Sequence, residues 1–432
     1  MPGKTISEKI LSRASRRDAH AGELVICDVD AAMGTDASAP MTLDYFERMG
    51  GTRVFDPSRL VFVFDHYAAD SSASTLSLQA RVRDFAIRQG VALYDCGAGV
   101  CHQLMVESGR TRPGALLVGA DSHSVTGGAL NAFATGIGSS DLAATMICGR
   151  IWLRVPETIS VVLTGTTRPG VYPKDIALAL AGRLGADGAS YQTIEFDGSG
   201  ATSLEVDDRL VLSNMSVEMG AKAGIFRADA KTAAYLASRA VTTPVVSRTG
   251  EAFTPVEPDA DAVYAREISL DLTQLEPAIA MPHHVDRVVG VGQAVGTPVH
   301  MAFIGTCTGG RVCDIHQAAG ILLAAGRIAP GVQVVIAPAS HQVDTCLRLD
   351  GTLDRLASLG ATIIPPGCGP CCGTAPPIPA DGANVISTAN RNFKARMGNA
   401  TALIYLASPA TCAASAVTGR ITGPREFGAV LT

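Results

Sequence analysis

Three cysteines lie within five residues of one another late in the chain, in the Pro- and Gly-rich segment 365–373. Cys368 and Cys371 flank a Gly-Pro turn, which brings both sulfurs to the same side of the backbone, so both can bind one metal centre. Cys307 stands about sixty residues upstream, again on a glycine-rich turn after an apolar run. Three thiols on two loops, with no fourth cysteine in an equally clear setting, predict an iron–sulfur cluster with one iron open to a substrate.

The segment around Cys368 also fits two other kinds of site. Cys-Gly-Pro-Cys is the redox pair of thioredoxin-like proteins, but that motif normally begins a helix early in a small domain. A structural zinc site needs a fourth ligand, for which Cys372 or a distant histidine is available. We favour the cluster over the redox pair, and the redox pair over zinc, because Cys307 belongs to the pattern. The redox alternative predicts that Cys307→Ser leaves activity intact.

Three histidines within about sixty residues of sequence lie next to aspartates or between two such pairs. His66 follows Asp65, His123 lies two residues after Asp121, and His102 lies between these pairs. A histidine beside a carboxylate holds a proton near neutral pH and can pass it to a leaving hydroxide. One such histidine would more often be a structural residue, but three of the nine in the chain favour a catalytic site.

Two further pairs of residues could contact a substrate. Asn214 and Glu218 are four residues apart, which on a helix places both on one face, and their small apolar neighbours favour burial. Arg391 and Arg396 offer two guanidinium groups, which bind carboxylates through paired hydrogen bonds, so a di- or tricarboxylic acid fits them. An exposed basic loop would carry the same two arginines, and these residues alone favour neither interpretation.

Apolar runs of strand length precede most of these polar residues, and helical stretches follow them. A short helix is expected over residues 7–14, and a first strand over 23–30 that is followed by a glycine turn. The pattern predicts an α/β fold with largely parallel sheets, whose ligands bind beyond the carboxyl ends of the strands. The other predicted strands are 59–64, 114–119, 159–164, 300–304 and 383–387.

The chain is long enough for about three domains. We place boundaries near residues 156 and 284, which gives domains 1–156, 157–284 and 285–432. The first carries the Asp/His loops, the second the helix of Asn214 and Glu218, and the third the cysteines and arginines. The second domain is expected to end in a surface connector over 241–284, where prolines and acidic residues interrupt any periodicity.

Composition limits the compartment and the partners. The chain has 432 residues, 47% of them apolar and 17% charged, and its charges sum to 35 − 40 = −5. This balance argues against nucleic acid as a partner and gives no basic surface for a membrane. The charged start of the chain does not resemble a signal peptide, no apolar run reaches membrane-spanning length, and eleven cysteines is an odd number. We therefore expect a reduced, cytoplasmic compartment.

Taken together, these motifs resemble the aconitase superfamily, and most closely its isopropylmalate isomerase (3-isopropylmalate dehydratase) large-subunit branch. The resemblance extends from about residue 6 to the end of the chain. Its segments are Phe64-Asp-His-Tyr, Cys101-His-Gln, Val118-Gly-Ala-Asp-Ser-His-Ser, Ala134-Thr-Gly-Ile-Gly-Ser-Ser-Asp, Asn214-Met-Ser-Val-Glu-Met-Gly-Ala-Lys-Ala-Gly, Ile304-Gly-Thr-Cys-Thr, Gly367-Cys-Gly-Pro-Cys and Ser387-Thr-Ala-Asn-Arg-Asn-Phe-Lys-Ala-Arg-Met-Gly.

The resemblance implies three α/β domains around a central cleft that holds a [4Fe–4S] cluster. Cys307, Cys368 and Cys371 would be its ligands, and the open iron would bind the substrate hydroxyl as a Lewis acid. The residues implied to move protons are Asp65, His66, His102, Asp121 and His123, with Glu218 near the open iron. The residues implied to bind the substrate are Ser122, Asn214, Arg391 and Arg396.

The resemblance also implies a partner. Full-length aconitases carry a swivelling domain with a catalytic serine, and this chain ends soon after Arg425. We expect no swivel domain in the chain and a separate small subunit in a heterodimer or heterotetramer, without which the chain is inactive. Two positions depart from the family pattern: Gly309 replaces an asparagine, and Thr35 replaces a histidine or glutamine. Both changes are consistent with a different substrate and also with neutral drift.

The sequence thus predicts the large subunit of an iron–sulfur hydro-lyase that dehydrates and rehydrates a hydroxy di- or tricarboxylic acid. Isopropylmalate is the best single substrate, with homoaconitate or 2,3-dimethylmalate as alternatives. A thiol–disulfide protein is a remote alternative. A cluster-free regulatory protein that binds RNA is another, and the acidic balance of the chain argues against it.

Overall fold

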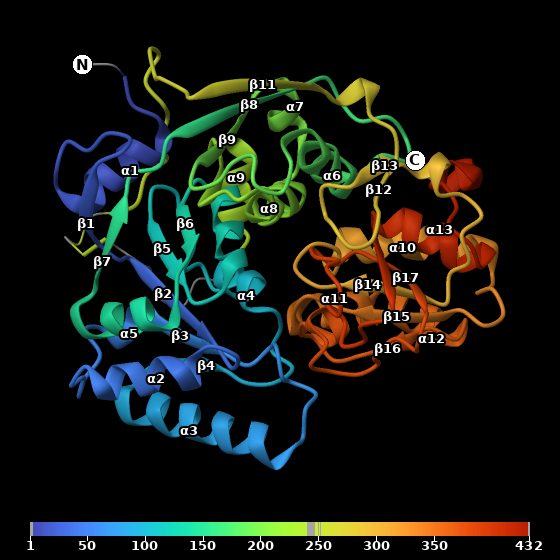
Figure 1. Cartoon of the computed structure of the whole chain (residues 1–432), viewed down its shortest axis with the longest axis horizontal. Helices are drawn as coiled ribbons and strands as arrows, with labels where there is room; N and C mark the ends of the chain where they lie inside the picture. The colour runs from blue at the N-terminus through green and yellow to red at the C-terminus, as the bar shows by residue number, and fades with distance from the viewer. Residues whose placement is uncertain (1–2, 240–246, 249, 251, 431–432) are drawn as a thin grey trace.

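A computed structural model of the chain describes residues 3–239, 247–248, 250 and 252–430. Three largely parallel sheets with their connecting helices follow one another along the chain, and Figure 1 shows them at the lower left, above the centre and on the right. The predicted α/β class is therefore confirmed. No helix in these described ranges is long and apolar enough to cross a membrane.

The first sheet has five parallel strands in the order β4-β3-β2-β5-β6. Its strands are β2 (Ala31–Thr35), β3 (Leu60–Val63), β4 (Ala92–Tyr94), β5 (Leu116–Gly119) and β6 (Phe133–Gly136). A separate antiparallel ribbon pairs β1 (Leu24–Asp28) with β7 (Arg150–Arg154). The helices of this part are α1 (Ile6–Ser15), α2 (Ala39–Arg48), α3 (Ala73–Gln89), α4 (Cys101–Glu107) and α5 (Ser139–Cys148), with 3-10 segments η1 (Pro57–Arg59) and η2 (Ser122–Leu130).

The central strand β2 corrects one expectation, because its residues were predicted as a glycine turn. All five of its residues are buried, and it pairs with β3 on one side and β5 on the other. Gly34 serves packing here, since a Cβ at this position would lie 3.0 Å from the Phe62 ring. A strand of small residues has a weak sequence signal, because its stability comes from burial between neighbours.

The second sheet has four parallel strands in the order β10-β9-β8-β11. Its elements are β8 (Thr158–Thr164), α6 (Pro173–Leu184), β9 (Thr193–Asp197), α7 (Gly198–Ser203), α8 (Val206–Met215), η3 (Ser216–Met219), β10 (Ala223–Phe226), α9 (Ala230–Ala237), β11 (Arg266–Asp271) and η4 (Leu272–Gln274). The segment expected as a connector therefore contributes the edge strand β11. Residues 240–246, 249 and 251 of that segment lie outside the described residues.

The third sheet has seven strands in the order β13-β12-β18-β17-β14-β15-β16, and β12 pairs antiparallel with both of its neighbours. Its strands are β12 (Ala278–Ala280), β13 (Val288–Gly290), β14 (Met301–Gly305), β15 (Gln333–Ala337), β16 (Thr362–Ile363), β17 (Asn384–Ser387) and β18 (Leu403–Leu406). Its helical segments are η5 (Val291–Gln293), α10 (Val312–Ala325), α11 (His341–Leu349), α12 (Thr352–Ser358), η6 (Gly369–Cys372), α13 (Pro409–Thr418) and η7 (Pro424–Val430). Because β12 precedes residue 284, the division there stays a prediction.

The carboxyl ends of these strands carry the chemistry-bearing residues. Asp65 follows β3, Asp121 follows β5, Cys307 follows β14, and Cys368 lies in the loop after β16. In parallel sheets such ends gather at one edge, where ligands bind. The edges of the first and third sheets face each other: the backbone N–H of Cys368 donates to the carbonyl of Asp65 at 3.0 Å.

Candidate active site

Asp65 and His66 form the first part of the site. The Asp65 carboxylate is buried, and its Oδ1 lies 2.7 Å from Nδ1 of His66. The backbone beyond β3 is held by Asp36, at the end of β2, whose carboxylate accepts the N–H groups of His66 and Tyr67, each at 3.0 Å. Burial lowers the pKa of His66, but the carboxylates of Asp65 and Asp121 outweigh it and raise the pKa well above its usual value. The two carboxylates therefore favour the protonated form of the ring.

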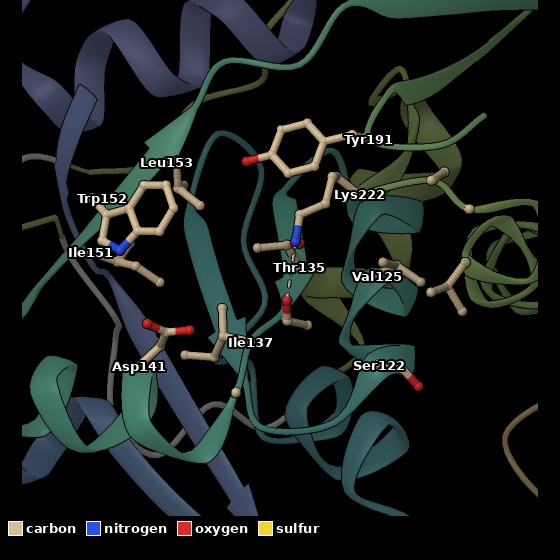
Figure 2. A pocket seen from close by; sticks show the side chains of 15 residues that line it. Ser122, Val125, Thr135, Ile137, Asp141, Ile151, Trp152, Leu153, Tyr191 and Lys222 are labelled. Carbon is tan, nitrogen blue, oxygen red and sulfur yellow. Dashed lines mark hydrogen bonds between the residues drawn. The ribbon is translucent and has the colours of Figure 1, made fainter. Parts of the chain in front are cut away.

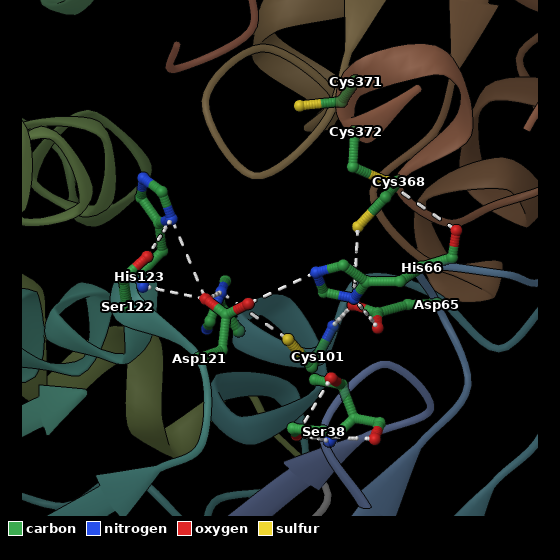
Figure 3. Close-up of polar contacts among 12 residues, drawn as sticks. Ser38, Asp65, His66, Cys101, Asp121, Ser122, His123, Cys368, Cys371 and Cys372 are labelled. Atoms are coloured by element: carbon green, nitrogen blue, oxygen red, sulfur yellow. Dashed lines mark hydrogen bonds and ion pairs between the residues drawn. The ribbon is translucent and has the colours of Figure 1, made fainter. Parts of the chain in front are cut away.

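Asp121 lies at the centre of this network (Figure 3). Its Oδ2 lies 3.3 Å from Nε2 of His66, and its Oδ1 lies 3.0 Å from Nε2 of His102. The same Oδ1 accepts the backbone N–H of His123 at 2.8 Å. Burial raises the pKa of Asp121, but these hydrogen bonds and the charge of His102 outweigh it and hold the pKa well below its usual value. One carboxylate therefore organises all three predicted histidines.

Glu218 joins the network to the third sheet. Its Oε1 lies 2.8 Å from Nε2 of His123 and 2.7 Å from Nε of Arg391, which donates to it. Nη2 of Arg391 donates to Oγ of Ser122 at 3.0 Å. Burial raises the pKa of Glu218, but hydrogen bonds and charges from His123 and Arg391 lower it by more, so the net shift is downward. Loop residues of the first and third sheets and the η3 turn of the second unit thus form one continuous polar chain.

Asn214 and Glu218 are both buried near one another, but not on one regular helix as predicted. α8 ends at Met215, and Glu218 lies on the 3-10 turn η3. Asn214 donates to Oγ1 of Thr126 at 2.8 Å, and its Oδ1 accepts from Nδ2 of Asn390 at 3.4 Å. The change of helical pitch rotates Glu218 relative to the α8 face. A spacing of four residues therefore could not fix its direction.

The three predicted cysteine ligands converge as buried thiols. Asn390 joins two of them, since its Nδ2 donates to Sγ of Cys307 at 3.4 Å and its Oδ1 lies 3.9 Å from Sγ of Cys371. The third, Cys368, has its Sγ 3.6 Å from Oδ2 of Asp65. Figure 3 shows Cys368 and Cys371 on the same side of His66. Burial raises the pKa of Cys307 to about 12, so a bound metal would be needed to hold it as a thiolate.

The spacing of these sulfurs bears on the zinc alternative. Sulfurs around one zinc lie only about 3.8 Å apart. In the part of the chain that the structure describes, two groups of ligand atoms lie within 4.8 Å of one another, Asp65–His66–Cys368 and His102–Asp121–His123, and neither contains two cysteines. The three sulfurs are therefore not all within 4.8 Å of one another, which fits a multi-iron cluster better than a single ion.

The redox alternative is also disfavoured by the environment of Cys368. Hydrogen bonding with Cys372 and burial raise the pKa of Cys368 well above its usual value. The attacking thiol of a Cys-X-X-Cys oxidoreductase has a lowered pKa instead. Cys372 has the opposite shift: hydrogen bonding with Cys368, and to a lesser extent with Thr374, lowers its pKa to about 5. Its Sγ lies 2.9 Å from Oγ1 of Thr374.

Arg396 lies beside the cysteines. Its Nη2 lies 3.6 Å from Sγ of Cys371, and its buried Nε has no hydrogen-bond partner among the described residues. A guanidinium N–H without a partner beside a thiol can donate a hydrogen bond to an anion or to a bound cluster. Arg391 and Arg396 are therefore brought to the site, and the exposed-loop interpretation does not hold for them.

Sequence reasoning did not find two residues that contact this site. Asn390 bonds to the sulfur of Cys307, and the buried Lys174 reaches the same loop from α6 through Thr308. Their signal was weak, since an asparagine before Arg391 and a lysine in a helix have many ordinary roles. Only the packing of the second unit against the third brings Lys174 to the cysteine loop.

A cavity of about 480 Å³ adjoins the polar network at Ser122 without containing the cysteines (Figure 2). It lies between β6, β7 and the segment that follows η3, and Lys222, Tyr191 and Trp152 project into it. The candidate chemistry is not inside this cavity but at its edge.

A family comparison agrees with this geometry. The model of the aconitase family (aconitate hydratase) matches residues 8–298 and 293–419. The chain belongs to the aconitase family. Its likeness to the crystal structure of Thermococcus kodakaraensis aconitase X (holo-form), with a TM-score of 0.50, 12% identity and 87% of each chain covered, is a likeness of fold.

Relatives of this aconitase-family chain match it over nearly their full length. The 3-isopropylmalate dehydratase large subunit 1 of Methanopyrus kandleri is 46% identical over 98% of this chain and 100% of its own. The protein of the same name from Thermotoga maritima is 44% identical with the same coverage. A probable methanogen homoaconitase large subunit from Methanosarcina mazei is 43% identical over 93% of this chain and 100% of its own.

The two departures from the family pattern have local packing partners. A Cβ at Gly309 would lie 2.3 Å from Cβ and Oγ1 of Thr388, so the chain has no room for a side chain there. Thr35 is buried, and its backbone N–H donates to Oγ of Ser38 at 3.0 Å, at the start of α2. Both substitutions are thus accommodated by contacts within the chain.

Proposed function

We propose that this chain is the large subunit of an iron–sulfur hydro-lyase, which removes water from a hydroxy di- or tricarboxylic acid and adds it back at the neighbouring carbon. One observation carries the proposal: Sγ of Cys368 lies 3.6 Å from Oδ2 of Asp65 and 4.0 Å from Nδ1 of His66. A leaving hydroxide needs a metal and a proton donor at the same place. The cysteines and the histidine network meet there.

Cys307, Cys368 and Cys371 would hold a [4Fe–4S] cluster, which when bound supplies a Lewis acid for the substrate hydroxyl. Three features support this assignment. The thiols are buried, the three sulfurs are not all within 4.8 Å of one another, and Asn390 and Arg396 lie within contact of two of them. Hydrogen-bond donors beside cluster sulfurs stabilise the thiolate form and shift the reduction potential of the cluster.

His66 would give its proton to the departing hydroxide. Asp65 and Asp121 hold the charged ring between them, and His102 shares Asp121. On the other side of Asp121, His123 is oriented by Glu218. His66 and His123, at the two ends of this network, would each hold a proton at a fixed position while the substrate is bound.

Arg391, Arg396, Ser122 and Asn214 would bind the substrate. The side chain of Arg391 is 27% exposed, and it points with Ser122 toward the same polar network. Nε of Arg396 has no partner among the described residues, and an unpartnered buried guanidinium donor fits a carboxylate. Two such groups suit a substrate with at least two carboxylates.

The best single substrate is 3-isopropylmalate, which would be isomerised to or from 2-isopropylmalate. The relatives from Methanopyrus kandleri and Thermotoga maritima support this choice by name. Homoaconitate is the second candidate, supported by the Methanosarcina mazei relative. Dimethylmalate remains a weaker third.

A small swivel-domain subunit would complete the active site, because relatives that match this chain end to end are named large subunits. We propose a heterodimer or heterotetramer in the cytoplasm, with no nucleic acid as a partner. We also propose the division into units 1–156, 157–284 and 285–432, although β12 of the third sheet lies before residue 284.

The decisive test is the iron and sulfide content of the chain after anaerobic reconstitution, with its electronic spectrum, for wild type and Cys307→Ser. About four irons per chain and a broad absorption band at about 400 nm, both lost in the variant, are expected. Wild-type chain that holds no iron would overturn the proposal, and the redox alternative would then take its place. With a small subunit added, turnover of 3-isopropylmalate against homoaconitate and 2,3-dimethylmalate decides the substrate.

A further inference from the structure

Lys174 is a buried lysine with three oxygen acceptors. It lies in the first turn of α6, and only 1% of the residue is exposed. Its Nζ donates to the carbonyls of Ala389 at 2.7 Å and Thr388 at 3.0 Å, and to Oγ1 of Thr308 at 3.3 Å. Three acceptors require three N–H groups, so the amine is bound in its protonated form.

Among the described residues, no aspartate or glutamate forms an ion pair with Lys174, and its hydrogen bonds go to neutral acceptors. The carboxylates of Glu218, Asp175 and Asp314 act on the ammonium only from a greater distance. A buried ammonium without a counter-ion is costly, and in proteins such a charge is normally paired. Burial lowers the pKa of Lys174 to about 8, which still leaves most of the amine protonated at neutral pH. Some other negative charge is expected near it.

The acceptors of Lys174 belong to the segments that carry the candidate cluster site. Thr308 directly follows Cys307, and its Oγ1 also donates to the Thr388 carbonyl at 2.7 Å. Ala389 directly precedes Asn390, which bonds to the Cys307 sulfur. One ammonium from the second sheet's helix α6 thus ties together two loops of the third.

We propose that Lys174 is the positioning residue and buried counter-ion of the cysteine site, fixing the Cys307 loop against the Asn390 segment and balancing the thiolates of a bound cluster. The inference rests on the proposed function. With three thiolates on a cluster, the centre carries negative charge, and the ammonium beside it stabilises both the thiolates and the reduced cluster. Removing it would loosen the loop and lower the reduction potential.

The test compares the reconstituted wild type with Lys174→Met, which keeps length and apolar volume, and with Lys222→Met as a matched control. Lys222 also projects from the second sheet and donates to a backbone carbonyl of the first, that of Gly136 at 3.4 Å, but it does not contact the cysteine loops. The measurements are the rate of iron loss to a chelator, the midpoint potential of the cluster, and the thermal unfolding midpoint of the metal-free chains.

We expect Lys174→Met to lose iron about tenfold faster or more and to show a lower midpoint potential, with Lys222→Met unchanged. If Lys174→Met does not fold, Thr308→Val removes one of its acceptors and is expected to speed iron loss by a smaller factor. The inference alone would be overturned if Lys174→Met retained iron and kept the wild-type potential. If Lys174→Met does not fold, the same result in Thr308→Val would overturn it. Wild type without a cluster would overturn the proposed function and this inference together.

Discussion

Oδ2 of Asp121 lies 3.3 Å from Nε2 of His66, whose other ring nitrogen lies 2.7 Å from Asp65. The imidazole is therefore held between two carboxylates that come from the ends of different strands. Neither carboxylate is exposed enough for water to weaken the interaction, since the Asp65 side chain is fully buried and that of Asp121 is 14% exposed. Two buried negative charges keep one proton on the ring.

Asp121→Asn should slow turnover strongly with the small subunit present. The amide keeps the shape of the side chain but removes one of the two carboxylate charges, those of Asp65 and Asp121, that raise the pKa of His66. We expect kcat to fall by about 10²–10⁴-fold, as for loss of an acid–base group. In the proposed mechanism activity requires protonated His66, so the alkaline limb of the pH profile should move to lower pH. The control is Asp354→Asn on the exposed face of α12, and a profile that does not move in Asp121→Asn would contradict the assignment.

Arg391→Lys should raise KM more than it lowers kcat. Lysine keeps the positive charge but cannot reproduce the guanidinium fork, which here donates to both Glu218 and Ser122. We expect kcat/KM to fall by about 10²-fold, roughly 3 kcal/mol of transition-state stabilisation. Steady-state kinetics check this, with the exposed Arg348→Lys as the matched change. Unaltered KM would remove Arg391 from substrate binding.

Cys372→Ser should leave the cluster in place. Its sulfur contacts Thr374 and the carbonyl of His66 at 3.7 Å, whereas the three proposed ligands face Asp65, Asn390 and Arg396. Reconstituted Cys372→Ser is therefore expected to hold about four irons per chain. Iron analysis beside Cys307→Ser measures the contrast. Loss of iron in both variants would indicate that Cys372 is also a ligand.

Glu195→Gln should change how stability depends on pH. Glu195 is buried and accepts the backbone N–H of Ser7 at 3.0 Å, and burial raises its pKa to about 7. A carboxyl whose folded-state pKa is raised stabilises the fold below its unfolded pKa of about 4.5, and this contribution is lost as pH rises to about 7. Glutamine resembles the protonated acid, so the variant should gain up to about 3 kcal/mol over wild type above pH 7.

Urea unfolding at pH 5 and pH 8 measures this difference. The exposed Glu267→Gln on β11 is the control and should change little at either pH. If Glu195→Gln shifts the unfolding midpoint by the same amount at pH 5 and pH 8, titration of the Glu195 carboxyl is not the cause.

Gly309→Ala should destabilise the chain. The new Cβ would lie 2.3 Å from the Thr388 side chain, closer than any normal contact, so the cysteine loop would have to move. Overpacking of this kind costs about 1–3 kcal/mol. Chemical unfolding of the metal-free chain checks this against Gly292→Ala, whose Cβ would meet no atom within 4 Å. Equal stability of the two variants would show that the loop adapts freely.

The strands that precede the site were predictable because their signal is local. The runs over residues 59–64, 114–119, 300–304 and 383–387 became β3, β5, β14 and β17 with only small changes at their ends. Continuous apolar runs of this length favour buried parallel strands wherever they occur. β2 was missed because its small residues carry little intrinsic preference and depend on Phe62 and the neighbouring strands.

The sequence by itself determined the α/β class, the cysteine pattern and the acid–histidine pairs, because each depends on residues that are close together in the chain. Only the tertiary structure decided that Asp121 serves three histidines, that Arg391 meets Glu218, and that Lys174 reaches the cysteine loop. Those contacts join residues separated by up to 173 positions. They exist because parallel strands bring their carboxyl ends to one edge, and which loops meet there follows from how the three sheets pack.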